Sequence, residues 1–74
     1  MNMLIEVKVL KYVRDKINIV AVEEFEIQGE RYKLKNPLPI EKLFTMCVQK
    51  KDGNYLCLKN DIETILHYIK IGML

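Results

Sequence analysis

The 74-residue sequence has no tryptophan, one histidine, two cysteines, two prolines and three glycines. The glycines stand alone at positions 29, 53 and 72, which excludes a glycine-rich phosphate-binding loop. The spacing of the two cysteines fits no zinc site, and the single histidine could not complete one. We therefore expect no metal and no cofactor. No apolar stretch approaches the ~18 residues that a membrane span requires, so we expect no membrane partner.

Candidate catalytic groups are few. His67 has only Glu63, one helical turn earlier, at a spacing that suggests a partner. Catalysis by a nucleophile needs the nucleophile, a base and a group that orients the base, and no such set is recognisable. In the acidic segment 23–30, Glu24 and Glu26 are expected to pair with lysines, and a run of charge is usually a solvated face. We expect no catalytic residue and no enzyme.

Glu6 and Lys8 interrupt the apolar N-terminal segment, so no signal peptide is recognisable. We therefore expect a cytoplasmic protein with reduced thiols at Cys47 and Cys57, since free cysteine commonly behaves as a small hydrophobic residue. A disulfide between them would form only in an oxidising environment. The wealth of Ile, Lys and Asn is typical of AT-rich DNA, and we hypothesise an origin in a phage or another mobile element.

Half of the residues are apolar, 30% are charged, and the net charge is +2. This balance excludes intrinsic disorder. The net charge alone is too small to indicate a nucleic-acid or membrane binder. With no linker, repeat or low-complexity tract, residues 1–74 are expected to form a single small domain.

Alternation of apolar and polar residues predicts a sheet. Ile5, Val7 and Val9 alternate with charged residues, and the segment 17–28 is rich in β-branched residues. Prolines 37 and 39 end the third predicted strand, because proline cannot continue a ladder. The expected elements are strands at about 3–13, 17–28, 31–36, 43–50 and 54–59, and a helix at about 61–71.

The turn between the second and third strands has a well-defined prediction. A two-residue loop at Gly29-Glu30 suits a type II′ turn, which has glycine at its first central position. In this register the apolar residues of both strands share one face, and residues of opposite charge pair on the other. A shift of the register by one residue would disrupt both faces. The register pairs Ile27 with Tyr32, Phe25 with Leu34, Glu26 with Lys33, Glu24 with Lys35 and Gln28 with Arg31.

The sequence pattern of residues 40–51 is compatible with two structures, a helix and a strand. Its apolar residues fall at helical spacing, with Pro39 as a first helical residue and Lys50-Lys51 in the last turn. The same segment also alternates, and a loop at 51–53 with Gly53 in the left-handed region would make it a hairpin strand. We favour the strand. Its register pairs Val48 with Leu56 and Met46 with Leu58, and it sets Cys47 opposite Cys57.

The C-terminal segment has a clear helical pattern. Asn60 is a candidate N-cap with Glu63 at the capping-box spacing, and Gly72 is a natural stop. His67 points away from the apolar stripe, which consists of Ile62, Ile65, Leu66 and Ile69.

We therefore expect an α+β domain: a five-stranded antiparallel meander, strongly curved or small-barrel-like, with one C-terminal helix. This plan resembles that of small SH3-like or chromo-like barrels. The resemblance rests on no matching motif and so implies no function.

Strands 1 and 2 are apolar on both faces, and both faces must then be covered. One helix covers part of one face only. The remainder is closed either by the curling of the sheet on itself or by another chain. We therefore predict a small protein-binding module that pairs with itself as a homodimer and with an unidentified protein. The expected interface residues are Leu10, Tyr12, Val20, Val22, Ile71 and Met73.

A nucleic-acid-binding barrel is the alternative. Residues 31–59 hold seven basic side chains against two acidic ones. Basic residues beside exposed aromatic rings could bind a single strand by stacking, with strong salt dependence. The residues expected to make that contact are Arg31, Lys33, Lys50, Lys51 and Lys59.

Overall fold

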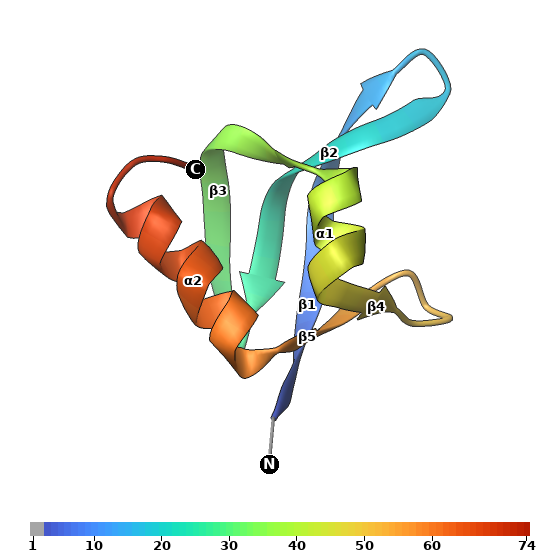
Figure 1. Ribbon diagram of the computed structural model, residues 1–74. Helices are drawn as coiled ribbons and strands as arrows, with labels where there is room; N and C mark the ends of the chain where they lie inside the picture. Colours follow the sequence, from blue (N-terminus) through green and yellow to red (C-terminus); the bar gives the residue numbers. More distant parts are fainter. Residues whose placement is uncertain (1–2) are drawn as a thin grey trace.

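The computed structural model describes residues 3–74, which form five strands and two helices. All five strands are antiparallel and belong to one sheet in the order β3-β2-β1-β5-β4 (Figure 1). The expected α+β class and C-terminal helix are confirmed. The elements are β1 (Leu4–Asp15), β2 (Asn18–Ile27), β3 (Glu30–Pro39), α1 (Ile40–Met46), β4 (Cys47–Gln49), β5 (Tyr55–Leu58) and α2 (Lys59–Lys70).

The strand order differs from a simple meander. The first three strands follow one another across the sheet, but the β4-β5 hairpin joins the free side of β1 rather than that of β3. The strands β3 and β4 are therefore the two edges, and the sheet stays open between them. Because the sheet is not closed, the expected strongly curved or small-barrel-like form is not confirmed.

The segment 40–51 combines both structures that its pattern allowed. Residues 40–46 are helical, so the strand predicted over 43–50 is wrong for its first half, and a second helix is present. The helix lets Leu43, which is only 1% exposed, enter the core while Phe44 faces solvent. The second half is the strand β4, where Val48 pairs with Leu56 as predicted. Met46 lies in the helix and does not pair with Leu58.

The β2-β3 turn is displaced by one residue from its predicted position. Its central residues are Gln28 and Gly29, with φ values of 51° and 84°. Two successive positive φ values are the mark of a type I′ turn. Each β2 residue therefore pairs with the β3 residue two positions before its predicted partner. Because side chains alternate between the two faces, a shift of two positions leaves each residue on its predicted face. The observed pairs are Ile27 with Glu30, Glu26 with Arg31, Phe25 with Tyr32 and Glu24 with Lys33.

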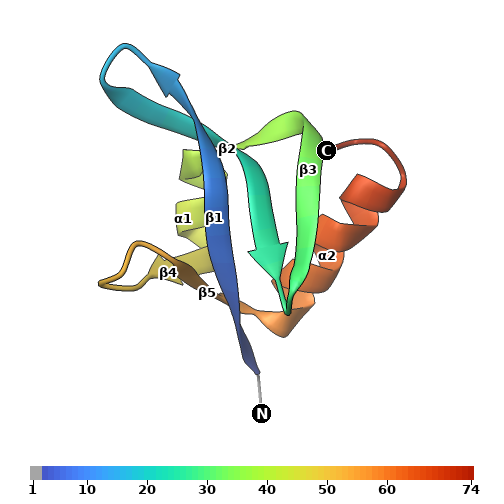
Figure 2. The same cartoon turned by 180° about the vertical axis from the view of Figure 1, so that it is seen from behind.

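Both helices lie on the same face of the sheet (Figures 1 and 2). The core lies between this face and the helices, and Tyr55, Phe25, Leu43 and Ile62 are among its most buried side chains. The opposite face carries cross-strand charges, since Lys8 of β1 is opposite Glu26 of β2, which is itself opposite Arg31 of β3.

The helix α2 begins earlier than predicted. Its N-cap is Leu58, and Asn60 lies in the first turn, where its carbonyl accepts a hydrogen bond from the Thr64 hydroxyl. The backbone N–H of Lys59 donates to the carbonyl of Met3, so the residue that precedes β1 satisfies one free donor of the helix. Gly72, at φ 82°, ends the helix as predicted.

The distal part of the β1-β2 hairpin, residues 10–20, projects beyond the rest of the chain (Figures 1 and 2). We call this segment the arm. Its turn at Lys16 has a φ of 56°, and the next residue, Ile17, is 89% exposed.

Candidate protein-interaction surface

Apolar side chains of the arm and of α1 line one hollow. Its volume is about 180 Å³, and its walls come from β1, β2, α1, β4 and β5. Ile19 and Phe44 are exposed at its rim, with Phe44 54% exposed, whereas Tyr12 and Ile40 are half-buried. We call Tyr12, Ile19, Ile40 and Phe44 the arm–α1 surface. Gln49 and Tyr55 complete the lining of the hollow.

Tyr55 is the buried support of this surface. It lies on β5 opposite Val7 and Gln49 and is 1% exposed. Its ring lies 5.9 Å from that of Phe44, centroid to centroid, at an interplanar angle of 51°. Burial, together with the smaller effect of the neighbouring Tyr12 phenol, raises the pKa of the Tyr55 phenol to about 12. Phe44 therefore packs against the ring of a buried tyrosine whose phenol is neutral at physiological pH.

The predicted interface residues do not all lie at the surface. Leu10 and Val20 are exposed on the arm, and Tyr12 is half-buried at its base. Val22 is 0% exposed, because its side chain belongs to the core of the chain itself. It is therefore corrected to a core residue.

The two C-terminal residues of the predicted interface lie elsewhere. Ile71 and Met73 are exposed, but they follow α2 on the side of the molecule away from the arm (Figure 1). The carbonyl of Met73 accepts a hydrogen bond from the Asn36 side-chain amide of β3 at 3.1 Å, which ties the tail to the sheet edge. The structure therefore separates the predicted interface into an arm part and a tail part.

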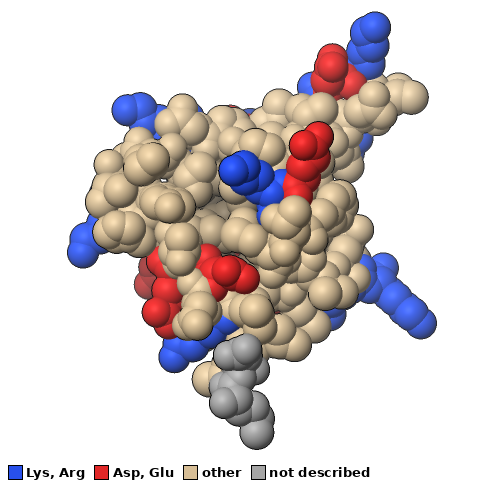
Figure 3. All heavy atoms as spheres, in the orientation of Figure 1, with Lys and Arg blue, Asp and Glu red and all other residues tan. Residues whose placement is uncertain are grey.

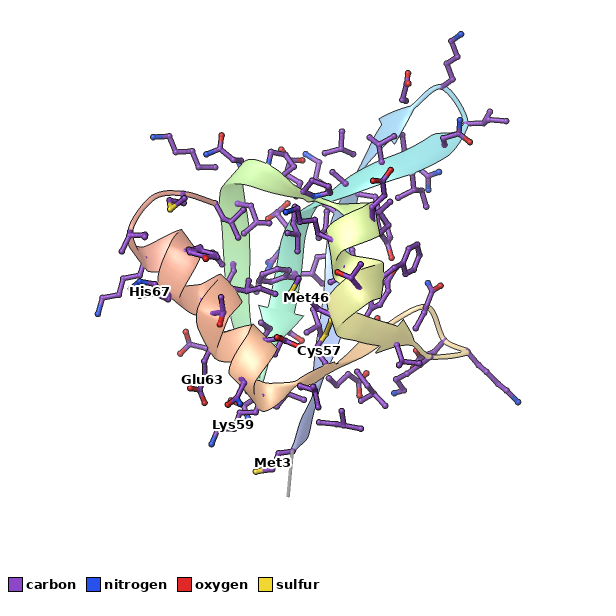
Figure 4. The ribbon with its side chains drawn as sticks, in the orientation of Figure 1. Met3, Met46, Cys57, Lys59, Glu63 and His67 are labelled. Atoms are coloured by element: carbon purple, nitrogen blue, oxygen red, sulfur yellow. A yellow bond between two sulfur atoms is a disulfide. The ribbon has the colours of Figure 1, made fainter. Side chains whose placement is uncertain are left out.

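The predicted nucleic-acid contacts are dispersed. Arg31 and Lys33 lie on the edge strand β3, opposite Glu26 and Glu24 of β2. Lys50 and Lys51 lie at the β4-β5 turn, which is at the other edge of the sheet. Lys59 begins α2, and Figure 4 shows it beside Met3. These five basic residues do not form one continuous patch.

Lys50 is held within a polar network at the β4-β5 turn. Its ammonium lies 3.1 Å from a Glu6 carboxylate oxygen and 3.3 Å from one of Asp52. The hydrogen bond to Glu6 raises the pKa of Lys50. The backbone N–H of Asn54 donates to Asp52 Oδ1 at 2.9 Å and lowers the pKa of Asp52, as does Lys50. This network anchors the turn to β1 and uses the charge of Lys50 within the chain.

Cys47 and Cys57 face each other as the strand alternative predicted, but they form a disulfide. The expectation of reduced thiols is not met in this structure. Both residues are buried. Among residues 3–74, no three His, Cys, Asp or Glu side chains come together in a way that could hold a metal ion. No helix of this part of the chain is long and apolar enough to cross a membrane.

Ile19, Ile40 and Phe44 were not predicted from the sequence as surface residues. Ile19 could have been found, because it lies in the segment that is apolar on both faces. Phe44 and Ile40 depended on the choice between helix and strand, since their exposure follows from the helical geometry of α1.

Comparison of the chain with known protein families, with curated proteins and with solved structures finds no match.

Proposed function

We propose that this protein is a small protein-binding module that forms a homodimer through its arm and the arm–α1 surface. The supporting observation is the position of the arm. It extends away from the core, and its apolar side chains Leu10, Ile17, Ile19 and Val20 stay exposed. Exposed apolar surface of this kind is typical of protein-interaction sites.

The hollow at the base of the arm supports the same proposal. Its aromatic walls, from Tyr12, Phe44 and Tyr55, offer a site for an apolar anchor of a partner. Aromatic anchors in hollows dominate the energetics of many interfaces. In a two-fold dimer the same patch serves both subunits, and the arm of one copy can lie along the arm–α1 surface of the other. A cytoplasmic location is kept as a separate proposal, and the Cys47–Cys57 disulfide argues against it, because such a bond persists in an oxidising environment.

The arm also supports a protein partner better than a nucleic acid. The ammonium of Lys11 lies 3.1 Å from a Glu23 oxygen, and that hydrogen bond raises the pKa of Lys11. The basic residues of the alternative site are dispersed over both edges of the sheet and the start of α2. Strong binding to a phosphate backbone requires several cations that act together.

Light scattering after size exclusion tests the proposal. We expect a dimer in both low and high salt, because apolar contacts are not screened. The variant Ile19→Glu/Phe44→Glu should be monomeric and folded. Val48→Glu is the matched control, since Val48 is an exposed apolar residue of β4 outside the arm–α1 surface, and this variant should remain dimeric. A monomeric parent chain, or a double variant that stays dimeric, contradicts the proposal.

A further inference from the structure

A second hollow lies between the two helices, away from the arm. It has a volume of about 410 Å³ and is bounded by the end of β3, by α1, by α2 and by the C-terminal tail. Figure 3 shows mostly uncharged surface between the helices, whereas acidic side chains gather over the first part of α2. We call this hollow the interhelical groove.

The walls of the interhelical groove are mainly apolar. Leu38 and Ile65 are buried in the core beneath it, and Met46 and Leu74 are half-buried along it. Figure 4 shows Met46 between α1 and α2. Methionine is flexible and polarisable, so it adapts to apolar ligands of different shape. A volume of this size with mostly apolar walls and a few polar groups is usual for small-molecule sites.

One lining residue is charged. Lys42 of α1 contributes to the groove, and no acidic residue does so among those described. Lys42 forms no ion pair with any side chain of residues 3–74. Tyr68 and Thr64 of α2 also line the groove, and the Thr64 hydroxyl already donates to the Asn60 carbonyl. The interhelical groove therefore combines mainly apolar walls with one lysine, Lys42, that forms no ion pair within residues 3–74.

We propose that the interhelical groove binds a small amphipathic carboxylate, whose apolar chain lies along Met46 and Ile65 and whose carboxylate pairs with Lys42. A neutral apolar ligand would leave the ammonium without a partner, and a cationic one would be repelled by it. This site is separate from the arm–α1 surface and does not depend on the proposed dimer.

Decanoate, used below its micelle concentration, is the probe. Amide chemical shifts of the isotope-labelled protein should change saturably in the segments 38–46 and 64–74. Decylammonium should bind at least fivefold more weakly than decanoate. Shift changes confined to the arm, no saturable binding, or equal affinity for the two head groups would overturn the proposal.

Variants separate the head-group contact from the apolar contact. Lys42→Gln should weaken decanoate binding about fivefold to tenfold and leave decanol binding unchanged. Lys51→Gln, which removes an exposed lysine at the β4-β5 turn, is the matched control and should bind decanoate normally. Met46→Trp should fill the groove and abolish binding of both ligands while the dimer, if formed, persists. Unchanged decanoate affinity in Lys42→Gln contradicts the proposal.

A vesicle experiment distinguishes the free carboxylate from a membrane lipid. Sedimentation with vesicles of phosphatidylcholine and phosphatidylglycerol should leave the protein in the supernatant. Stable association with these vesicles, together with no saturable decanoate binding, would overturn the assignment to a free carboxylate.

Discussion

Cys47 and Cys57 lie directly opposite each other across the β4-β5 hairpin, with Cα atoms 4.3 Å apart and their sulfurs joined in a disulfide. Cys47 immediately follows α1, and Cys57 lies two residues before α2. The bond therefore links the segment that ends one helix to the segment that begins the other. Each helix forms one wall of the interhelical groove, so the disulfide helps to hold those walls in place.

We predict that loss of the disulfide lowers the free energy of unfolding by about 1–3 kcal/mol. The bond closes a short loop, and constraint of the unfolded chain grows with loop length. Urea unfolding of the Cys47→Ala/Cys57→Ala variant, compared with the oxidised parent, measures the change.

The reduced parent chain is the control for that experiment and should resemble the double variant in stability. Mass spectrometry checks the redox state directly. The parent chain, unfolded without reductant, should incorporate no iodoacetamide, because both thiols are oxidised. Two alkylated cysteines in such a sample would contradict the bond.

Tyr55 predicts a loss of stability at alkaline pH. Its pKa is about 12 in the folded protein, mainly because of burial, and about 10 in the unfolded chain. A raised pKa means that the folded state holds the proton longer, so its stabilising effect is complete below pH 10 and is lost as the pH rises toward 12. At pH 11 the free energy of unfolding should fall by about 1 kcal/mol.

The variant Tyr55→Phe isolates this effect. Its free energy of unfolding should show a smaller decrease between pH 9 and pH 11 than that of the parent. Tyr68→Phe is the control, since it also removes one phenol hydroxyl, but from an exposed side chain outside the core. Identical pH dependence in the parent and in Tyr55→Phe would contradict the assignment.

Adjacent residues of α1 should have opposite roles. Leu43 is buried in the core, so Leu43→Ala should lower the free energy of unfolding by about 2–4 kcal/mol. Phe44 is largely exposed, so Phe44→Ala should cost under about 1 kcal/mol when measured on the monomer. Urea unfolding of both variants checks this.

The milder variant Leu43→Val keeps that test informative if Leu43→Ala does not fold, with an expected loss of about 1 kcal/mol. A larger loss for Phe44→Ala than for Leu43→Ala would indicate that residues 43–46 belong to the strand predicted over 43–50 rather than to α1.

Local patterns predicted the local elements well. The alternation of Ile5 and Val7 and the spacing of Ile62 and Ile65 each reflect one buried face, and each element was found where its pattern lay. The β4-β5 register could also be predicted from the local sequence, because Gly53, at φ 91°, sets the turn that pairs Val48 with Leu56.

Longer-range features could not be derived in the same way. The pairing of Ile5 with Cys57 places the last hairpin beside β1, and no periodicity in either strand specifies its neighbour. This pairing leaves β3 and β4 as edges and so prevents closure of the barrel. The arm–α1 surface depends on the same arrangement, since it joins Ile19 to Phe44 of a distant segment.

The β2-β3 turn provides a test of register. With Gln28 and Gly29 both at positive φ, Gln28→Asn should raise the free energy of unfolding by about 0.5 kcal/mol, because asparagine adopts this conformation more readily. Gly29→Ala should lower it by about 1 kcal/mol. A Cβ at Gly29 would meet no atom within 4 Å, so that cost reflects backbone conformation alone. If the loop were Gly29-Glu30, Gln28 would be a strand residue, and Gln28→Asn would instead destabilise the protein.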